Sequence, residues 1–391
     1  MSKRKIFALI LCIFCFATLL VGCTEDDDNQ FWLDKYKEMN KGQPEVIETV
    51  DIDFYIIKGE GMSEDNRITK AVQDKINQSL NAKYHTNVNI KYISESDYAA
   101  TVNGFNDETS GIVLINSEET MDVLNGKLAD LYPYIHGDGY KAEGFGQLNM
   151  QISSSLMNAA IVEERGTEKL FCVPNNHVIG CYELIVIDKQ LAFNAGYPYS
   201  ETEFKSLKTW ESTEDLRIKA NLIGDEFSNI DYKDYNPTSG AVVTRVVNAP
   251  YTAIAAIEKQ GFVVNVSKYP EADSAEVYSS AFAVLNAAPK VYAADNTTVE
   301  KTVALDTYKL RAMQVIFAIN TDENIRNLLL YGVENINYTI DSVTKTVIPN
   351  SEKPYDMKLE YTGDVFKALY SDKWTKNDYN NGILQNKDSE K

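Results

Sequence analysis

Two cysteines with a histidine between them stand in a strand-like stretch near the middle of the chain, "LFCVPNNHVIGCYELIVID" (170–188). Cys172, His177 and Cys181 follow the spacing C-x4-H-x3-C, and each of these side chains can bind zinc. A structural zinc site needs four ligands at tighter spacing, and the other two histidines stand far away in the sequence. We therefore expect no metal here. Two alternatives remain open: a disulfide between Cys172 and Cys181, or two free thiols that pack as small apolar groups.

The polar residues between the cysteines suit a different chemistry. Asn175 and Asn176 each offer two hydrogen-bond donors and an acceptor, which suits a hydroxyl-rich ligand, although asparagine also favours turns. The chain has 24 tyrosines, and most of them should be half-buried packing residues with a hydroxyl in water. Those that line a binding site could stack on sugar rings, and by position we select Tyr55, Tyr182 and Tyr251.

The sequence offers no recognisable catalytic motif. It contains no H-E-x-x-H, no G-x-S-x-G and no Walker loop, and its three histidines are scattered. Although 57 residues are acidic, no spacing rule singles out a catalytic pair. We expect no enzymatic activity and no cofactor.

The start of the chain is typical of an exported lipoprotein. Lys3, Arg4 and Lys5 precede an apolar run, Ile6 to Leu20, which is too short to span a membrane as a helix. The following "LVGC" (20–23) resembles the bacterial lipobox, which implies a signal peptide over 1–22 and a lipidated Cys23. An acidic tether over 23–47 would then hold the body on the extracytoplasmic face of the cell membrane.

Charge and size narrow the class of partner. Removal of residues 1–22 takes away three positive charges and no negative one, so the net charge falls from −19 to −22. Such a balance argues against nucleic acid and against anionic lipid surfaces as partners. The length of 391 residues suggests two domain-sized units, and 44% hydrophobic residues are enough to bury real cores.

Strands and helices alternate along the body. "VDIDFYIIKG" (50–59) is typical of a strand, Ser63 is a candidate N-cap, and a four-residue apolar spacing predicts a helix before the strand 87–93. The apolar stripe of that helix consists of Ile68, Val72, Ile76 and Leu80. A βαβ unit of this kind, repeated, predicts a mainly parallel sheet covered on both faces. A later helix should begin after a Thr321 cap and end near Gly332.

Four segments together resemble the extracellular solute-binding lipoproteins of bacterial ABC importers, in particular the carbohydrate-type branch. They are similar, in the family's order, to its turn after the third strand, its crossing segment, its T-W helix start and its late helix: "NGKLADLYPYI", "EKLFCVPNNHVIGCYELIVIDKQLAFNAGY", "KTWESTEDL" and "TDENIRNLLLYGVENINY". The resemblance covers about residues 48 to 345. The chain departs from the family pattern at Asn335, where a glycine is usual, and in having only about 30 residues between Trp210 and Gly240, which shortens the second lobe.

The resemblance implies an α/β, two-lobed periplasmic-binding-protein-like fold (type II) with a hinge and an inter-lobe cleft. We expect chain crossings near 174–182 and 277–283, lobe one at 48–175 with 283–340, and lobe two at 176–278. Because "DVFKALYSDKW" has helical spacing, residues 341–391 should pack back on the body, with 384–391 frayed. The expected ligand-binding residues are Tyr55, Asn175, Asn176, Tyr182, Asn248, Tyr251 and Glu334.

The function implied is delivery of a small ligand, a sugar or oligosaccharide first, to an ABC permease by open-to-closed motion of a monomer. A peptide or cation is the second choice of ligand, since the net charge is acidic. The alternative function is a ligand-binding sensor or surface-interaction lipoprotein without a transport role.

Overall fold

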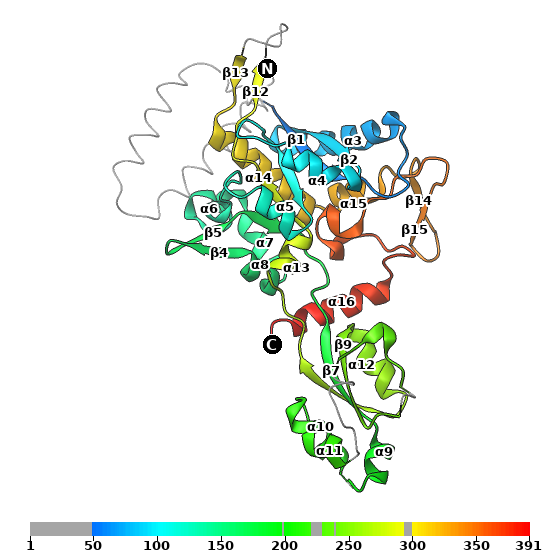
Figure 1. The fold of residues 1–391 in the computed structure, drawn as a ribbon. Helices are drawn as coiled ribbons and strands as arrows, with labels where there is room; N and C mark the ends of the chain where they lie inside the picture. Colours follow the sequence, from blue (N-terminus) through cyan, green and yellow to red (C-terminus); the bar gives the residue numbers. More distant parts are fainter. Residues whose placement is uncertain (1–48, 198, 220–228, 238–239, 293–298) are drawn as a thin grey trace. The chain divides into compact units, whose positions relative to one another are not determined.

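The computed structural model describes residues 49–197, 199–219, 229–237, 240–292 and 299–391. In this part of the chain, two separate β-sheets each carry their own hydrophobic cores (Figure 1). We call each sheet with the helices packed on it a lobe: the first sheet belongs to lobe one and the second to lobe two. The signal peptide, the lipidated Cys23 and the tether predicted above lie outside the described residues. None of the described helices combines the length and the apolarity that a membrane crossing requires.

The sheet of lobe one has five strands in the order β2-β1-β3-β11-β6. The strands are β1 (Val50–Ile57), β2 (Thr86–Ile93), β3 (Ile112–Ile115), β6 (Cys172–Pro174) and β11 (Ala281–Val284). β1 pairs in parallel with both β2 and β3, which confirms the predicted βαβ unit, whereas β11 is antiparallel to β3 and β6. All four residues of β3 are fully buried, so both faces of the sheet are covered at its centre.

The helices of lobe one pack in two groups around this sheet. One group is α3 (Asn66–Tyr84), α14 (Leu305–Thr321), α15 (Glu323–Tyr331) and α7 (Leu148–Gln151), and the other is α4 (Glu95–Asn103), α5 (Glu118–Val123), α8 (Ser154–Ala160) and α13 (Ser274–Ser279). A short helix, α6 (Tyr132–His136), packs beside the 3-10 turns η1 (Asp138–Glu143) and η2 (Phe145–Gln147). The predicted apolar stripe of α3 is buried, although the N-cap is Asp65 and not Ser63. The cap of α15 is likewise Asp322 rather than Thr321.

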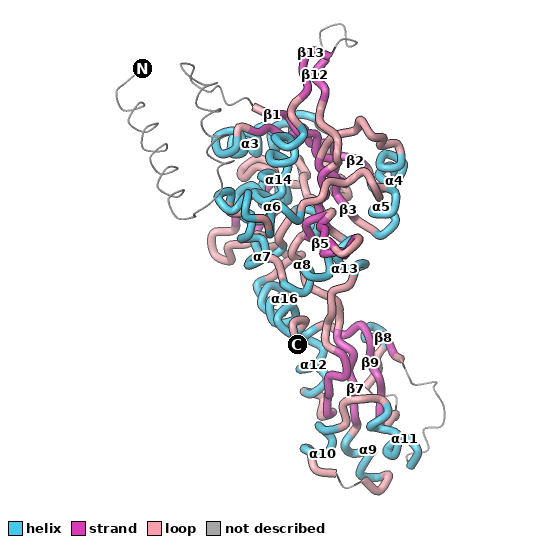
Figure 2. The backbone as a smooth tube through the Cα atoms, turned by 90° about the vertical axis from the view of Figure 1, so that its left-hand side faces the viewer, coloured by secondary structure: helices cyan, strands magenta, loops and turns pink. Residues whose placement is uncertain are grey.

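The sheet of lobe two has four strands in the order β10-β7-β9-β8. They are β7 (Tyr182–Ile187), β8 (Ile230–Asp231), β9 (Val243–Ala249) and β10 (Val263–Lys268) (Figure 2). Side chains of β7 alternate between two cores: Ile185 and Ile187 face one, and Leu184 and Val186 face the other. Residues of α9 (Lys189–Asn194), α10 (Glu201–Ser206) and α11 (Glu214–Lys219) belong to the first core, and residues of α12 (Tyr251–Glu258) belong to the second.

Both sheets are mixed, which corrects the prediction of a mainly parallel sheet. In lobe one the strand that runs against its neighbours is β11, and in lobe two it is β7. Each of these is the first strand after the chain arrives from the other lobe. Elsewhere two strands joined by a helix are parallel, as predicted: β9 and β10, joined by α12, point in the same direction on either side of β7. The exceptions therefore arise at the crossings, where a strand enters a sheet from the neighbouring lobe.

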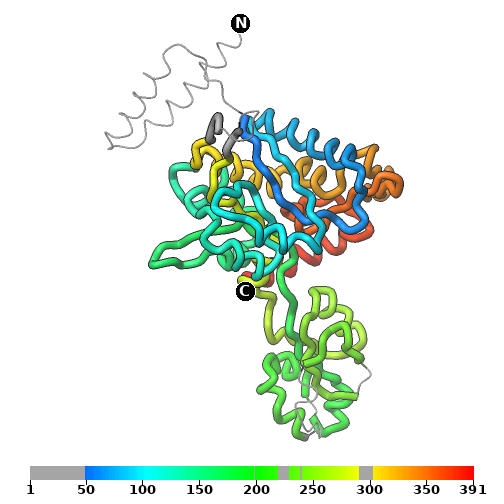
Figure 3. Tube along the Cα trace, turned by 45° about the horizontal axis from the view of Figure 1, so that its top comes forward, coloured from blue at the N-terminus to red at the C-terminus, as the bar shows by residue number. Residues whose placement is uncertain are grey.

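The chain passes between the lobes twice. The first crossing segment, residues 175–181, joins β6 to β7, and the second, residues 269–273, joins β10 to α13 (Figure 3). The second lies before the predicted range 277–283, because α13 already packs on α5 and α8 of lobe one. From Thr49 to Lys391 the chain forms one unit by its internal contacts.

The C-terminal segment packs on lobe one, but its helix lies at other residues than those predicted. Residues 364–374 form only a short 3-10 turn, η7 (Val365–Lys367), after a similar turn, η6 (Leu359–Thr362). The helix is α16 (Lys376–Asp388), which extends over most of the residues 384–391 that were expected to be frayed. Three hairpins complete the description: β4 (Ile161–Glu164) with β5 (Thr167–Leu170), β12 (Lys290–Tyr292) with β13 (Val299–Thr302), and β14 (Tyr338–Ile340) with β15 (Val347–Pro349).

Candidate functional site

The two asparagines of the first crossing segment are buried and bonded inside the protein. Asn175 is fully buried, and its amide nitrogen donates to Ser280 Oγ and to the carbonyl of Glu360, both at 3.0 Å. The amide nitrogen of Asn176 donates to the Gln151 carbonyl at 2.9 Å and to Asp364 Oδ1 at 3.1 Å. In this structure both asparagines tie the crossing segment to lobe one, so their predicted contact with a ligand remains a prediction.

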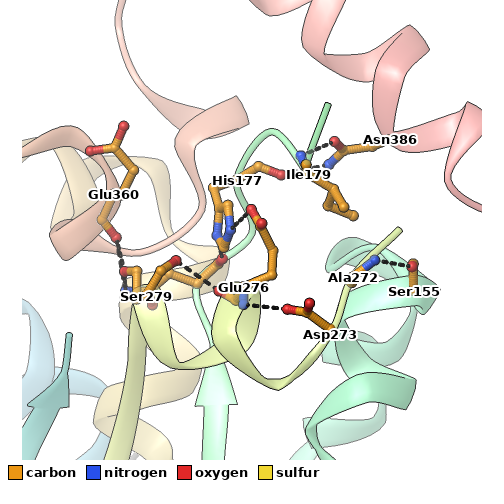
Figure 4. Close-up of polar contacts among 12 residues, drawn as sticks. Ser155, His177, Ile179, Ala272, Asp273, Glu276, Ser279, Glu360 and Asn386 are labelled. Atoms are coloured by element: carbon orange, nitrogen blue, oxygen red, sulfur yellow. Dashed lines mark hydrogen bonds and ion pairs between the residues drawn. The ribbon is translucent and has the colours of Figure 1, made fainter. Parts of the chain in front are cut away.

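The cysteine–histidine pattern forms neither a disulfide nor a metal site in the structure. Both thiols are free: Cys172 is buried in β6 and Cys181 is exposed, so the possible disulfide is not formed. Both ring nitrogens of His177 are already engaged, Nδ1 with the Asn175 carbonyl at 2.7 Å and Nε2 with Glu276 Oε1 at 3.0 Å (Figure 4). Over the described ranges, no group of three or more histidine, cysteine, aspartate or glutamate side chains is placed to hold a metal ion.

The remaining predicted ligand residues are dispersed. The rings of Tyr182 and Tyr251 come together at a centroid distance of 6.2 Å, but the hydroxyl of Tyr182 donates to Asp388. Tyr55 packs against Phe105 in lobe one, and Asn248 donates to Asp231 in lobe two. Glu334 is exposed after α15. The seven residues do not form one site.

A cavity of about 460 Å³ lies in lobe one, where β1 and β2 end. Its wall begins with the loop after β1, includes Glu95 at the start of α4, and continues with the end of α15 and with the C-terminal segment 356–374. Ligands of α/β proteins commonly bind outside the carboxyl ends of parallel strands. The position of this cavity makes it the candidate ligand-binding site.

The cavity wall exists because the C-terminal segment lies directly on the loop after β1. A Cβ atom at Gly59 would come within 1.7 Å of the Asp356 carbonyl oxygen, so only glycine permits this approach. A hydrogen bond from Ser63 N to the Pro354 carbonyl holds the same contact, and one from Met357 N to the Leu330 carbonyl ties the segment to α15, both at 3.0 Å. A segment from the far end of the sequence is thereby fixed beside β1.

Three aromatic side chains line the cavity: Tyr331, Tyr361 and Trp374. Tyr331 donates to the Leu369 carbonyl at 3.0 Å, and the Tyr361 hydroxyl accepts a hydrogen bond from Lys358 at 3.2 Å. Trp374 is only 6% exposed, and its Nε1 is buried without a hydrogen-bond partner. A buried donor that lacks a partner costs free energy unless another molecule supplies an acceptor. This indole N–H is therefore an unused donor in a residue of the cavity wall.

Two of the three lysines that line the cavity form ion pairs with acidic side chains. Lys58 pairs with Glu64, and Lys373 pairs with Asp356, a hydrogen bond that raises the pKa of Lys373. The ammonium of Lys358 lies 4.4 Å from the centre of the Tyr361 ring. Within the described residues, three further lining carboxylates form no ion pair: Glu60, Glu95 and Glu360. The cavity thus combines aromatic faces, hydrogen-bond acceptors and an excess of negative charge.

None of the predicted ligand residues lines this cavity, nor does any residue of lobe two. A second cavity, of about 270 Å³, is lined by lobe one, the C-terminal segment and the predicted ligand residue Asn176 of the first crossing segment. A third, of about 150 Å³, is lined by lobe one alone. The predicted inter-lobe cleft therefore remains a prediction. The glycine-containing loop "KGEGMS" (58–63), which follows the first strand, is the sequence feature that could have pointed to this edge of lobe one.

No protein-family model and no curated protein sequence matches the chain. Among solved structures, it is similar to the N-glycan transport solute-binding protein of Streptococcus pneumoniae at 13% identity, over 86% of this chain and 82% of that one, with a TM-score of 0.48. The same protein in complex with Man5GlcNAc gives 14% identity, the same coverages and a TM-score of 0.47. A sugar transporter of Rhizobium etli in an open conformation gives 13% identity over 88% and 98% of the two chains, with a TM-score of 0.27. Since these TM-scores are below 0.5, the functional argument rests on the residues of this chain alone.

Proposed function

We propose that this chain is an extracytoplasmic solute-binding lipoprotein that binds a sugar or oligosaccharide and delivers it to an ABC importer. The observation that carries the proposal is the cavity at the ends of β1 and β2, whose wall combines three aromatic side chains with carboxylates that form no ion pair among the described residues. The order of sequence segments that resembles solute-binding lipoproteins supports the same class.

The chemistry of the cavity suits a sugar. The aromatic rings offer flat apolar faces, against which the C–H faces of a sugar ring can pack. Carboxylates accept hydrogen bonds from sugar hydroxyls, and the Trp374 indole donates one. A volume of about 460 Å³ lies within the range of small-molecule sites, roughly 300 to 1,000 Å³.

Transport would use the two lobes and their two crossing segments. A ligand held by lobe one would shift the protein from an open to a closed state through added contacts with lobe two in the closed state, and the permease would bind that state. Lipid attachment at Cys23 would keep a monomer at the extracytoplasmic face of the membrane. Labelling with a radioactive fatty acid tests this anchor, since Cys23→Ser should abolish incorporation.

A thermal-shift screen against neutral oligosaccharides tests the proposed ligand class. A ligand present at ~100 times its dissociation constant should add about 2.7 kcal/mol to the free energy of unfolding. Trp374→Phe should reduce that gain, while Trp210→Phe, which changes a tryptophan of the lobe-two core, serves as the matched control. If no oligosaccharide raises the melting temperature, the sugar assignment is wrong.

A cationic ligand is the second candidate. The carboxylates without ion pairs favour it, whereas Lys58 and Lys373 are already neutralised by acidic partners. Polyamines and basic peptides form the second arm of the same screen, at low and at high salt. A stabilisation that high salt removes would identify a charged ligand in place of a neutral sugar.

A further inference from the structure

The last helix of the chain binds the main chain of the first crossing segment. The Asn386 amide donates to the His177 carbonyl at 2.7 Å and accepts from Ile179 N at 2.9 Å (Figure 4). Gln385 Nε2 donates to the carbonyls of Ile179 and Gly180 at 2.9 and 2.6 Å. Since residues 175–181 belong to no strand, these two side chains satisfy backbone groups that a sheet would otherwise pair.

The same helical turn also reaches lobe two. Gln385 Oε1 accepts a hydrogen bond at 3.0 Å from Tyr251 N, which stands at the start of α12, where helix N–H groups lack partners within the helix. Tyr182, the first residue of β7, donates its hydroxyl to Asp388 Oδ2 at 2.7 Å. Gln385 is therefore bonded to the crossing segment through its nitrogen and to lobe two through its oxygen.

Nearer its start, α16 is fixed to lobe one. The ring of Tyr379 packs against Phe366 and Tyr370, at centroid distances of 5.8 and 6.0 Å. Gly382 lets the helix come close, because a Cβ there would lie 2.7 Å from Val178 Cγ2 and 3.0 Å from the Phe366 ring. The helix is thus held by lobe one, lies on the crossing segment, and bonds to lobe two at its end.

We propose that α16 is a splint on the hinge: it sets the preferred angle between the lobes through the bonds Gln385–Tyr251 and Tyr182–Asp388. Because lobe one and the crossing segment hold the helix, a rotation of lobe two must break or exchange these two bonds. Packed interfaces of this kind tend to have discrete arrangements rather than to deform continuously. This inference depends on the proposed function in one respect: it assumes that the rotation of lobe two accompanies ligand binding.

Amide hydrogen exchange tests the bonds themselves. Gln385→Ala should accelerate exchange at the Tyr251 amide about fivefold or more, because its acceptor is lost. Asn380→Ala, at an exposed position of the same helix, is the control and should leave the exchange rate of the Tyr251 amide unchanged.

The distance between the lobes tests the consequence. Spin labels are attached at the exposed Lys83 of lobe one and Lys259 of lobe two through keto-bearing amino acids, so that no cysteine is involved. Tyr182→Phe leaves α16 unchanged and removes one splint bond; it should broaden or shift the distance distribution, and Asn380→Ala should not. An unchanged distribution in Tyr182→Phe and in Gln385→Ala would overturn the splint. Neither measurement uses a ligand, so failure of the sugar proposal would leave this result standing.

Discussion

The Asp364→Asn substitution tests the buried polar layer beneath the first crossing segment. Asp364 is 3% exposed and accepts hydrogen bonds from Asn176 Nδ2 at 3.1 Å and from Phe366 N at 3.0 Å. Burial raises the pKa of its carboxyl to about 6, although those hydrogen bonds and the positive charges of Lys367 and Arg326 act to lower it. The Asp364 carboxyl group therefore takes up a proton at a pH well above the ordinary range for an aspartate.

The sign and size of the effect follow from linkage. Because the folded-state pKa of about 6 exceeds the reference value of 3.8, the native state binds the proton more tightly than the unfolded state. The stabilisation is fully present below pH 3.8 and is lost as the pH rises through 6. At about 1.36 kcal/mol for each pKa unit, the loss is about 3 kcal/mol in the free energy of unfolding.

Urea unfolding at a series of pH values between 4 and 7 measures this contribution, with each variant compared to the parent. The amide of the Asp364→Asn variant keeps an acceptor oxygen but has no charge to bury, so the variant's stability relative to the parent should rise by about 2.4 kcal/mol between pH 4 and pH 7, because at pH 4 part of the full effect is already lost. Asp372→Asn, at an exposed position, controls for the loss of one formal charge. If the difference between parent and Asp364→Asn were the same at every pH, the reasoning about Asp364 would be refuted.

Three further outcomes are expected. Trp374→Phe should weaken the ligand identified in the screen by about 0.5 to 1.5 kcal/mol, the usual worth of one hydrogen bond, as measured by calorimetry; equal affinity would remove the indole from the site. Iodoacetamide at pH 8, followed by peptide mass spectrometry, should modify the exposed Cys181 and spare Cys172, whose burial raises the pKa of its thiol to about 12; equal modification would contradict the buried β6. Leu114→Ala, at a fully buried position of β3, should lower the free energy of unfolding by about 2 to 5 kcal/mol in urea titrations, and a loss below about 1 kcal/mol would contradict a close-packed lobe-one core.

The sequence predicts the elements whose burial is periodic. The four-residue stripe of α3 and the parallel pairing of β1 with β2 follow from patterns that packing on one face imposes. Strand direction at the crossings could not be predicted, because β7 and β11 have the same apolar composition as strands that run the other way. Their direction depends on where the chain enters the sheet.

The C-terminal helix shows why part of the molecule escapes sequence reasoning. The buried residues of α16 are Gly382, Gln385 and Asn386, of which two are amides and one has no side chain. A helix that buries polar groups against another segment's backbone leaves no apolar stripe to recognise. The helical spacing at 364–374 pointed instead to a segment that forms only a short 3-10 turn.

The cavity could not be predicted from the sequence for a related reason. Its walls join Ile57 and Gly59 to Tyr361 and Trp374, which lie far apart in the sequence. Tyrosine and asparagine near the crossing looked equally suited to a ligand, but the Asn175 amide nitrogen and the Tyr182 hydroxyl donate to groups within the protein. Only the fold distinguishes an aromatic side chain that lines a cavity from one that packs.

The measurement that tests the central claim most directly follows the Trp374 indole N–H by NMR. The chain has three tryptophans, so a 15N-labelled sample gives three indole resonances, and Trp374→Phe assigns the one of interest. Titration with an oligosaccharide that stabilises the protein should shift the Trp374 resonance downfield as its N–H gains an acceptor, while the Trp210 resonance in lobe two stays in place. If a ligand binds and the Trp374 resonance does not move, the ligand site is elsewhere and the proposed role of this cavity is wrong.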